Sequence, residues 1–385
     1  MKKIFLTAIA LLTMASAQVF GMYGVDSDWI NFLTHGNQFR ARLDQLGFTL
    51  GNDTIKGTFG FDSGANGRHG VYSDDIGQNG AADKVHYNFY PTISMGLAYT
   101  SSPISVGVGY NATIGTNKWT KYNGKVDGKT TEAVVHTPVL VLNAMDNAFR
   151  MAFPIQILHL SDKHEGGDKG SITAVSFDAQ FRYYTGLEIV PQIRLKLLYG
   201  TYKYNYDMGG TKEKGTFAES FGFQFRLYFG SVVEEVSVQP YIRIDYNTAL
   251  GKQHNQTGIT AVGVLGRAAN VASTFTETYT AAWETPAWNL KILPALGLSA
   301  NSDIVSLYLE PSLGFQVIQN GDATQKNVKE QFKLAYDVYA EMYITPLKNL
   351  EWYFEASIGN AGSVNPAPSV AFAATTGITW YLPQL

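Results

Sequence analysis

Residues 104–114 read ISVGVGYNATI. Every second residue is apolar, starting from Ile104, and serine, glycine, asparagine and threonine lie between them. Successive side chains of a β-strand point to opposite faces, so this period of two predicts a strand with one apolar and one polar face. The stretch exceeds the ~5–6 residues of an average soluble strand. It matches the ~9–11 residues that a transmembrane strand needs.

The same alternation recurs at 175–183, 221–229, 332–342 and 350–358. With weaker segments it gives about fifteen candidate strands, at 38–50, 54–62, 85–99, 104–115, 133–143, 149–160, 172–184, 187–200, 216–229, 236–248, 287–300, 304–318, 329–345, 349–360 and 368–382. We therefore predict an all-β protein, a transmembrane antiparallel up-and-down β-barrel of about 14 (or 16) strands with long external loops.

The connections between these candidates alternate in length along most of the chain. Short ones lie near 101–103, 185–186, 301–302 and 346–347. Long polar ones cover 63–84, 116–132, 161–171, 201–215, 249–286, 319–328 and 361–367. Short periplasmic turns and longer external loops are typical of outer-membrane barrels.

Strand parity raises a problem, because a bacterial barrel has an even number of strands. The weakest candidate is 38–50, where the period slips between Leu43 and Leu46. Without it the count is fourteen, which we prefer, and residues 22–50 become a periplasmic or plugging segment. A missed strand within 22–36 gives sixteen instead.

The chain begins MKKIFLTAIALLTMASAQVFG, residues 1–21. Lys2 and Lys3 precede an apolar run, and Ala15-Ser16-Ala17 forms a cleavage site, so residues 1–21 are predicted to be a signal peptide. A second cleavage position follows Gly21. We expect three parts: the signal peptide, an N-terminal segment at 22–50 (periplasmic, plug or first strand), and the barrel at 51–385.

The composition excludes several other classes of protein. Among 385 residues there are 38 glycines and no cysteine, and aromatic residues make up 13%. This composition favours strands and turns, and excludes disulfide scaffolds and thiol nucleophiles. The net charge of −3 provides no global attraction to nucleic acid. None of the seven histidines lies in a metal-binding spacing, and no nucleophile or nucleotide motif is present. We predict no enzyme activity, metal site or cofactor.

The charged residues on the polar faces of the strands fall into two sectors. If the apolar faces contact lipid, the alternate residues face the lumen. A basic sector is predicted at Arg182, Arg194, Lys196, Arg226 and Arg243. An acidic sector is predicted at Glu310, Asp337, Glu341, Glu351 and Glu355. Such a split would orient polar solutes and set ion selectivity; charges that pair and fill a closed interior are the alternative.

The last predicted strand carries four residues with a regular spacing: Thr375, Gly377, Trp380 and Leu382. They resemble the C-terminal signal by which the assembly machinery recognises the final strand of outer-membrane barrels. The chain departs from that pattern because it continues with Pro383-Gln384-Leu385.

Residues 22–48 read MYGVDSDWINFLTHGNQFRARLDQLGF. This stretch resembles the mature N-terminus of the variable surface proteins (Vsp) of Brachyspira, formerly Serpulina, spirochaetes. The resemblance implies an abundant, surface-exposed outer-membrane protein with a role in antigenic variation, in multimeric assemblies. It also favours cleavage after Gly21, and it carries no catalytic residues.

From the sequence we therefore predict a surface antigen of the bacterial outer membrane with porin-like diffusion activity. The alternatives are a dedicated solute transport pore with residues 22–50 as a hatch, a barrel enzyme with an acid and histidine cluster at the rim, and a secreted soluble β-protein. Expected partners are outer-membrane lipid, the barrel assembly machinery, further copies of the chain, and host immune molecules that contact the loops, with no nucleic acid.

Overall fold

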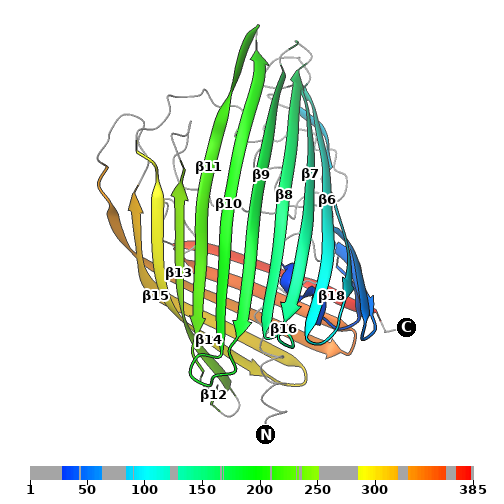
Figure 1. Cartoon of the computed structure of the whole chain (residues 1–385), viewed down its shortest axis with the longest axis vertical. Helices are drawn as coiled ribbons and strands as arrows, with labels where there is room; N and C mark the ends of the chain where they lie inside the picture. The colour runs from blue at the N-terminus through cyan, green and yellow to red at the C-terminus, as the bar shows by residue number, and fades with distance from the viewer. Residues whose placement is uncertain are drawn as a thin grey trace.

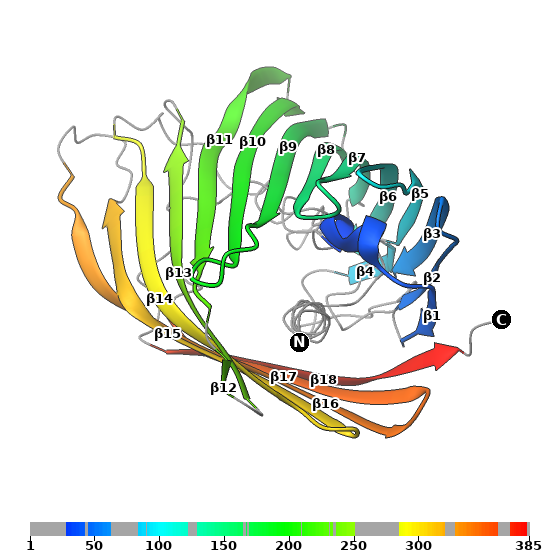
Figure 2. The same cartoon turned by 60° about the horizontal axis from the view of Figure 1, so that its bottom comes forward.

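The computed structural model describes residues 28–42, 45–62, 84–89, 91–121, 129–164, 167, 169–208, 210–230, 232–233, 236–250, 285–319, 328–360 and 370–382. These residues form one antiparallel sheet that curves round on itself, with a short helix inside it (Figures 1 and 2). The predicted signal peptide, both cleavage positions and most of the longest connections, 63–83 and 251–284, lie outside the described residues.

The elements follow the chain in simple order. The 3-10 helix is η1 (Asp28–Thr34), and the first strands are β1 (Gln38–Ala41), β2 (Gln45–Gly51), β3 (Ile55–Asp62), β4 (Lys84–Phe89), β5 (Thr92–Tyr99), β6 (Ile104–Lys121), β7 (Lys129–Ala144), β8 (Phe149–His164) and β9 (Lys169–Tyr184). The remaining strands are β10 (Gln192–Met208), β11 (Thr211–Tyr228), β12 (Val232–Val233), β13 (Val236–Ala249), β14 (Trp288–Asn301), β15 (Val305–Gln319), β16 (Gln331–Leu347), β17 (Leu350–Gly359) and β18 (Ala371–Leu382).

Within the described residues, the sheet closes as a barrel of sixteen strands. Each strand pairs with the next along the chain, and β18 pairs with β1. The labels exceed this number because β4 and β5 both pair with β6 and form one broken strand. In the same way β11 and the short β12 both pair with β13. Sixteen, the second of the two predicted counts, therefore replaces the preferred fourteen.

The two strands added to the preferred count come from the candidate at 38–50, which is a hairpin. Its halves are β1 and β2, and Arg42 N donates a backbone hydrogen bond of 2.8 Å to Gln45 O across the turn. The slip in period between Leu43 and Leu46 marks this turn. No strand lies in the described part of 22–36, where η1 is found instead. The barrel therefore begins at Gln38, before the expected boundary at residue 51.

Strands β6 to β11 extend well into the connections predicted at 116–132, 161–171 and 201–215. Strands β6 and β11 each have 18 residues and β10 has 17, against the ~9–11 that cross a membrane. They form a tall wing on one side of the barrel (Figure 1). The sequence pattern missed these extensions because their outer faces are polar, so the apolar alternation stops before the strands end.

The outer surface of the barrel is apolar and the inner surface is polar. Large apolar side chains of the alternating sets are exposed, such as Leu97 at 59% and Val108 at 58%. Polar side chains at the intervening positions are buried inside, including Ser105, Asn111, Thr137, Gln156, Ser176 and Gln180. This arrangement is the reverse of a soluble protein and suits lipid outside and water within. Within the described residues, backbone hydrogen bonds join each strand to its neighbours in the closed sheet, as lipid requires.

The seam that closes the barrel is short. Strand β1 meets β18 in three residue pairs, Phe39 with Leu382, Arg40 with Tyr381 and Ala41 with Trp380. One side-chain bond extends the seam, from Arg42 Nε to Thr379 Oγ1 at 2.7 Å. Closure therefore depends on very few backbone hydrogen bonds.

Across the described part of the chain, no helix is long and apolar enough to cross a membrane.

Candidate functional site in the barrel interior

Five arginines lie in one unbroken row on the inner wall. The strand registers place Arg150 opposite Arg182, Arg182 opposite Arg194, Arg194 opposite Arg226, and Arg226 opposite Arg243. The row runs across β8, β9, β10, β11 and β13, and we call it the arginine ladder. Like charges directly opposite each other repel across a sheet, so the ladder needs neighbours that stabilise it.

Most of these stabilising neighbours are uncharged. The guanidinium groups of Arg150, Arg194 and Arg226 lie 4.8, 4.7 and 5.6 Å from the ring centres of Tyr184, Tyr228 and Tyr241. These distances allow cation–π attraction.

Glutamines hold the centre of the arginine ladder. The Nε atoms of Arg194 and Arg226 donate to Gln192 and Gln224 at 3.1 and 2.9 Å. Both acceptors are neutral amides, so they fix the side chains without cancelling their charge.

Direct ion pairs with carboxylates lie at the margin of the basic sector, while Glu310 acts electrostatically on Arg226 without forming an ion pair with it. Arg243 forms a two-pronged ion pair with Asp245, at 3.0 Å from Nε and 2.7 Å from Nη2. Lys196 lies beside the ladder, 3.9 Å from Asp178. Of the described residues, no carboxylate forms an ion pair with Arg150, Arg182, Arg194 or Arg226.

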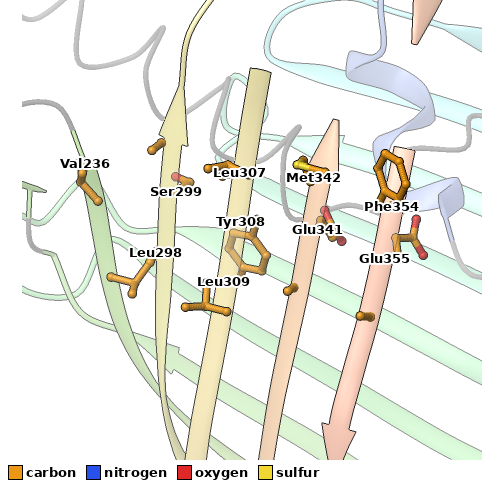
Figure 3. Close-up of a pocket in the computed structure, with 13 residues that line it drawn as sticks. Val236, Leu298, Ser299, Leu307, Tyr308, Leu309, Glu341, Met342, Phe354 and Glu355 are labelled. Carbon is orange, nitrogen blue, oxygen red and sulfur yellow. The ribbon is translucent and has the colours of Figure 1, made fainter. Parts of the chain in front are cut away.

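The acidic residues gather on strands β15 to β17. Glu341 lies directly opposite Glu355 in the register (Figure 3). Glu310 lies opposite Tyr339. Asp337 is on the same inward face of β16, and Glu351 is on that of β17. The five predicted acidic residues therefore share one wall.

Tyrosine hydroxyls donate hydrogen bonds to this acidic wall. Glu341 accepts from Tyr339 and from Tyr343, the latter at 3.2 Å. Glu310 accepts from Tyr308. Glu351 accepts from Tyr381 at 3.1 Å. Phenol donors satisfy these carboxylates without neutralising them, and Arg42 lies close enough to Glu351 and Glu355 to offset part of the negative charge of the wall.

The two charged walls face each other across the interior. In Figure 2, β8 to β11 form one side of the barrel and β16 to β18 form the other. The fold therefore separates charges of opposite sign that lie more than one hundred residues apart in sequence, such as Arg182 and Glu341.

Helix η1 packs against the inner wall at one end of the arginine ladder. Trp29, Ile30 and Phe32 are 0% exposed and form an apolar cluster with Val141 and Ala152. Figure 2 shows the helix inside the ring of strands. The helix therefore occupies space that would otherwise belong to the lumen.

Two glycines make room for Trp29. A Cβ atom added to Gly109 would lie 2.4 Å from the indole ring, and one added to Gly96 would lie 2.7 Å from it. Even alanine is too large at these positions. These two glycines lie on the polar faces of their strands. They therefore leave the space that the Trp29 side chain occupies.

Polar bonds also hold η1 in place. Arg182 Nη1 donates to Asn31 Oδ1 at 2.9 Å, and Arg150 Nη1 donates to Thr34 Oγ1 at 3.1 Å. Lys56 Nζ donates to the backbone oxygens of Leu33 at 3.0 Å and His35 at 2.5 Å. The first two arginines of the ladder thus bind the helix.

The four residues of the predicted assembly signal all lie on β18. Trp380, 56% exposed, and Leu382 share the outer face. Thr375 and Gly377 share the inner face, and a Cβ at Gly377 would lie 2.5 Å from the hydroxyl of Tyr353. Glycine at this position lets an aromatic side chain from β17 lie flat against the wall.

An apolar hollow of about 340 Å³ lies on the wall formed by β13 to β17 (Figure 3). The residues that line it are Val236, Leu298, Ser299, Ala300, Leu307, Tyr308, Leu309, Ala340, Glu341, Met342, Phe354, Glu355 and Ala356. Ala300, Ala340 and Ala356 are smaller than the leucines around them and so leave a dip. Its apolar lining suits lipid chains.

Sequence reasoning missed two parts of this interior. Arg150 belongs to the ladder, but its strand was not included in the basic sector. A longer scan of inward positions on β8 would have found it. The sequence indicates the packing of η1 against the wall only weakly. The indication is a group of apolar residues within a polar stretch: Trp29, Ile30, Phe32 and Leu33.

Residues 2–381 match the family described as Serpulina hyodysenteriae variable surface protein. The chain belongs to this variable surface protein family. The match covers almost the whole chain, whereas the resemblance seen in the sequence rested on residues 22–48. No curated protein matches the sequence significantly.

Solved structures give only distant matches to this family member. The copper transporter OprC is 9% identical with a TM-score of 0.41, and the match covers 85% of this chain and 56% of that chain. The translocator domain of the autotransporter NalP from Neisseria meningitidis is 14% identical with a TM-score of 0.30, covering 73% and 89%. BauA, the ferric preacinetobactin receptor from Acinetobacter baumannii, is 8% identical with a TM-score of 0.30, covering 88% and 71%.

The described residues contain no group of three or more histidine, aspartate or glutamate side chains that could hold a metal ion.

Proposed function

We propose that this variable surface protein is a diffusion pore of the bacterial outer membrane for small polar solutes. The observation that supports the proposal best is the inverted barrel, which is apolar outside and has a basic and an acidic wall inside. Burying so many charges in a filled interior would cost far more than hydrating them. Most ladder arginines lack carboxylate partners, which suits contact with water and solutes.

The separated charges also define how the pore would act on solutes. A lumen with one sign on each wall has a transverse field that is stronger than in bulk water, because the surrounding lipid has a low dielectric constant. Dipolar solutes would align in the field, and small ions would follow the wall of opposite sign.

Ion selectivity tests this proposal. Refolded protein in a planar bilayer is expected to give discrete conductance steps in KCl. Replacing Glu310, Glu341 and Glu355 with glutamine should shift the reversal potential under a salt gradient toward anion preference, because only the basic wall remains charged. Replacing Lys196, Arg226 and Arg243 with glutamine should shift it toward cations.

A control variant distinguishes the effect of charges that face the lumen from the effect of a charge change elsewhere on the protein. Lys163→Gln removes an exposed cation that pairs with Glu132 at 3.6 Å on the tall wing, and should leave selectivity unchanged. A folded barrel with heat-modifiable gel mobility but no conductance would contradict the pore.

Surface display with antigenic variation is the second function that we propose. Its support is the family name together with the tall wing, which has charged and exposed residues such as Lys203, Lys212 and Lys214. Strands that continue beyond the membrane thickness emerge into water at the end opposite to the short turns, which is the external end of bacterial barrels. Sequence at such positions varies at little cost to stability.

Single-cysteine labelling measures this orientation, and the chain has no native cysteine to interfere. The side chain of Lys212 is 79% exposed at the tip of the β10–β11 hairpin. Lys212→Cys should react with a membrane-impermeant maleimide on intact cells. Ser101→Cys, in the turn at the other end of the barrel, is the matched control and should react only after the outer membrane is disrupted. The reverse labelling pattern would overturn the proposed orientation.

The same proposal includes the partners expected from the sequence. Lipid would cover the apolar outer face, the assembly machinery would recognise β18, and host immune molecules would meet the tall wing. Self-association and the lack of an enzymatic activity belong to the proposal as well.

A further inference from the structure

The centre of the arginine ladder has the geometry of an anion site. Arg194 and Arg226 lie directly opposite each other in the register of β10 and β11, with Arg182 and Arg243 as the next residues on either side. Adjacent strands are ~4.8 Å apart, so the five arginines span roughly 20 Å of wall. This spacing brings guanidinium groups close enough for one polyvalent anion to contact two of them.

Hydrogen bonds fix these side chains and keep their donors available. Each central arginine uses Nε to bind a glutamine two residues earlier on its own strand, Gln192 or Gln224. In the described residues, the terminal nitrogens of Arg194 have no protein acceptor. Those of Arg226 have one long contact, from Nη1 to the Tyr228 hydroxyl at 3.5 Å. The side chains are therefore held in place through Nε and by the tyrosine rings, and their terminal nitrogens keep most of their hydrogen-bonding capacity.

The choice of amide rather than carboxylate neighbours is informative. Arg243, at the margin of the ladder, shows that an acidic residue two positions away makes a good ion pair, here with Asp245 at 2.7 Å. A carboxylate in place of Gln192 or Gln224 would form such an ion pair and neutralise the positive charge at the centre of the arginine ladder. Instead the fold keeps two opposed cations together, a destabilising arrangement that an anionic ligand relieves.

We propose that the arginine ladder binds oxyanions that carry two or more negative charges, with Arg194 and Arg226 as its central pair. Guanidinium forks match phosphate and carboxylate oxygens in a bidentate manner. Phosphoryl compounds and dicarboxylates share this chemistry. The inference rests on the proposed function in one respect, since the solute reaches the ladder through the lumen.

The test measures block of single-channel current by pyrophosphate, and separately by succinate, at constant ionic strength. Either anion is expected to reduce the current, and the one that binds more tightly identifies the phosphoryl or the dicarboxylate class. The double variant Arg194→Gln with Arg226→Gln should weaken the block about 100-fold, because charge-assisted hydrogen bonds are lost on both sides. Arg194→Lys with Arg226→Lys keeps the charge and should weaken it about tenfold.

The matched control is Lys333→Gln, which removes an inward cation outside the ladder and should leave the block unchanged. Equal block by the wild type and the lysine pair would show that charge alone acts, and would overturn the guanidinium site. A lack of block by both anions would overturn it as well.

Calorimetric titration of the refolded protein with pyrophosphate separates this inference from the pore. One outcome is a barrel that gives no conductance steps and still binds pyrophosphate, with binding lost in the double variant Arg194→Gln with Arg226→Gln. That result would support the arginine ladder and contradict the pore. Conductance steps without calorimetric binding would leave the pore standing and overturn the ladder.

Discussion

Replacing Trp29 with alanine should raise the single-channel conductance of the barrel and make it noisier. Trp29 is 0% exposed and occupies the hollow formed by Gly96 and Gly109. Loss of a buried tryptophan costs ~3–5 kcal/mol, which is on the order of 10²–10³-fold in an equilibrium constant. Helix η1 would then leave the wall for part of the time and widen the lumen. Recordings of wild type and variant at one salt concentration measure the change.

A second variant disrupts the contact between Trp29 and Gly109 by changing the glycine. Gly109→Val places side-chain atoms where the indole ring lies and should have the same effect as Trp29→Ala. Trp352→Ala is the control, because Trp352 is 47% exposed on the outer face and its loss should leave the conductance unchanged. Identical conductance in wild type and both η1 variants, with normal heat-modifiable mobility, would show that η1 does not narrow the pore.

Replacing Ala41 with proline should prevent the barrel from closing. Strand β1 contacts β18 through three residue pairs, and Ala41 pairs with both Trp380 and Leu46. Proline removes a backbone donor, and an unsatisfied backbone group in lipid costs several kcal/mol. The folded fraction after refolding into lipid vesicles, read from heat-modifiable gel mobility, should fall to a small part of the wild-type value.

Two controls assign this effect to the seam. Ala41→Val keeps the backbone donor and an apolar outer side chain, and should fold normally. Ala371→Pro puts proline at the first residue of β18, a position where strands tolerate it, and should also fold. If Ala41→Pro folded as well as Ala371→Pro, the pairing of β1 with β18 would not be what closes the barrel.

The alternation of side chains made the architecture predictable, because it is a local property of each strand. Residues such as Val106 and Val108 lie on the outer face, as their period requires, and the five acidic positions share an inward face. The strand count was harder to predict, because the β1–β2 hairpin at 38–51 is shorter than the window in which periodicity is visible.

The extended strands show a second limit of periodicity. Residues 201–208 and 211–215 continue β10 and β11 although their outward positions, such as Lys203 and Asn205, are polar. The apolar pattern reports contact with lipid, and it ends where the strand leaves the membrane. Backbone pairing with the neighbouring strand continues, and no local sequence signal records that pairing.

The sequence by itself determined that this is a barrel with an apolar exterior and a charged interior, because each strand shows its two faces independently. Only the tertiary structure aligned Arg150, Arg182, Arg194, Arg226 and Arg243 into one row, because that alignment depends on the register between strands. It also placed Trp29 against Gly96 and Gly109, some seventy to eighty residues away. Register and docking are set by the sum of contacts over the closed sheet, and no single segment contains that information.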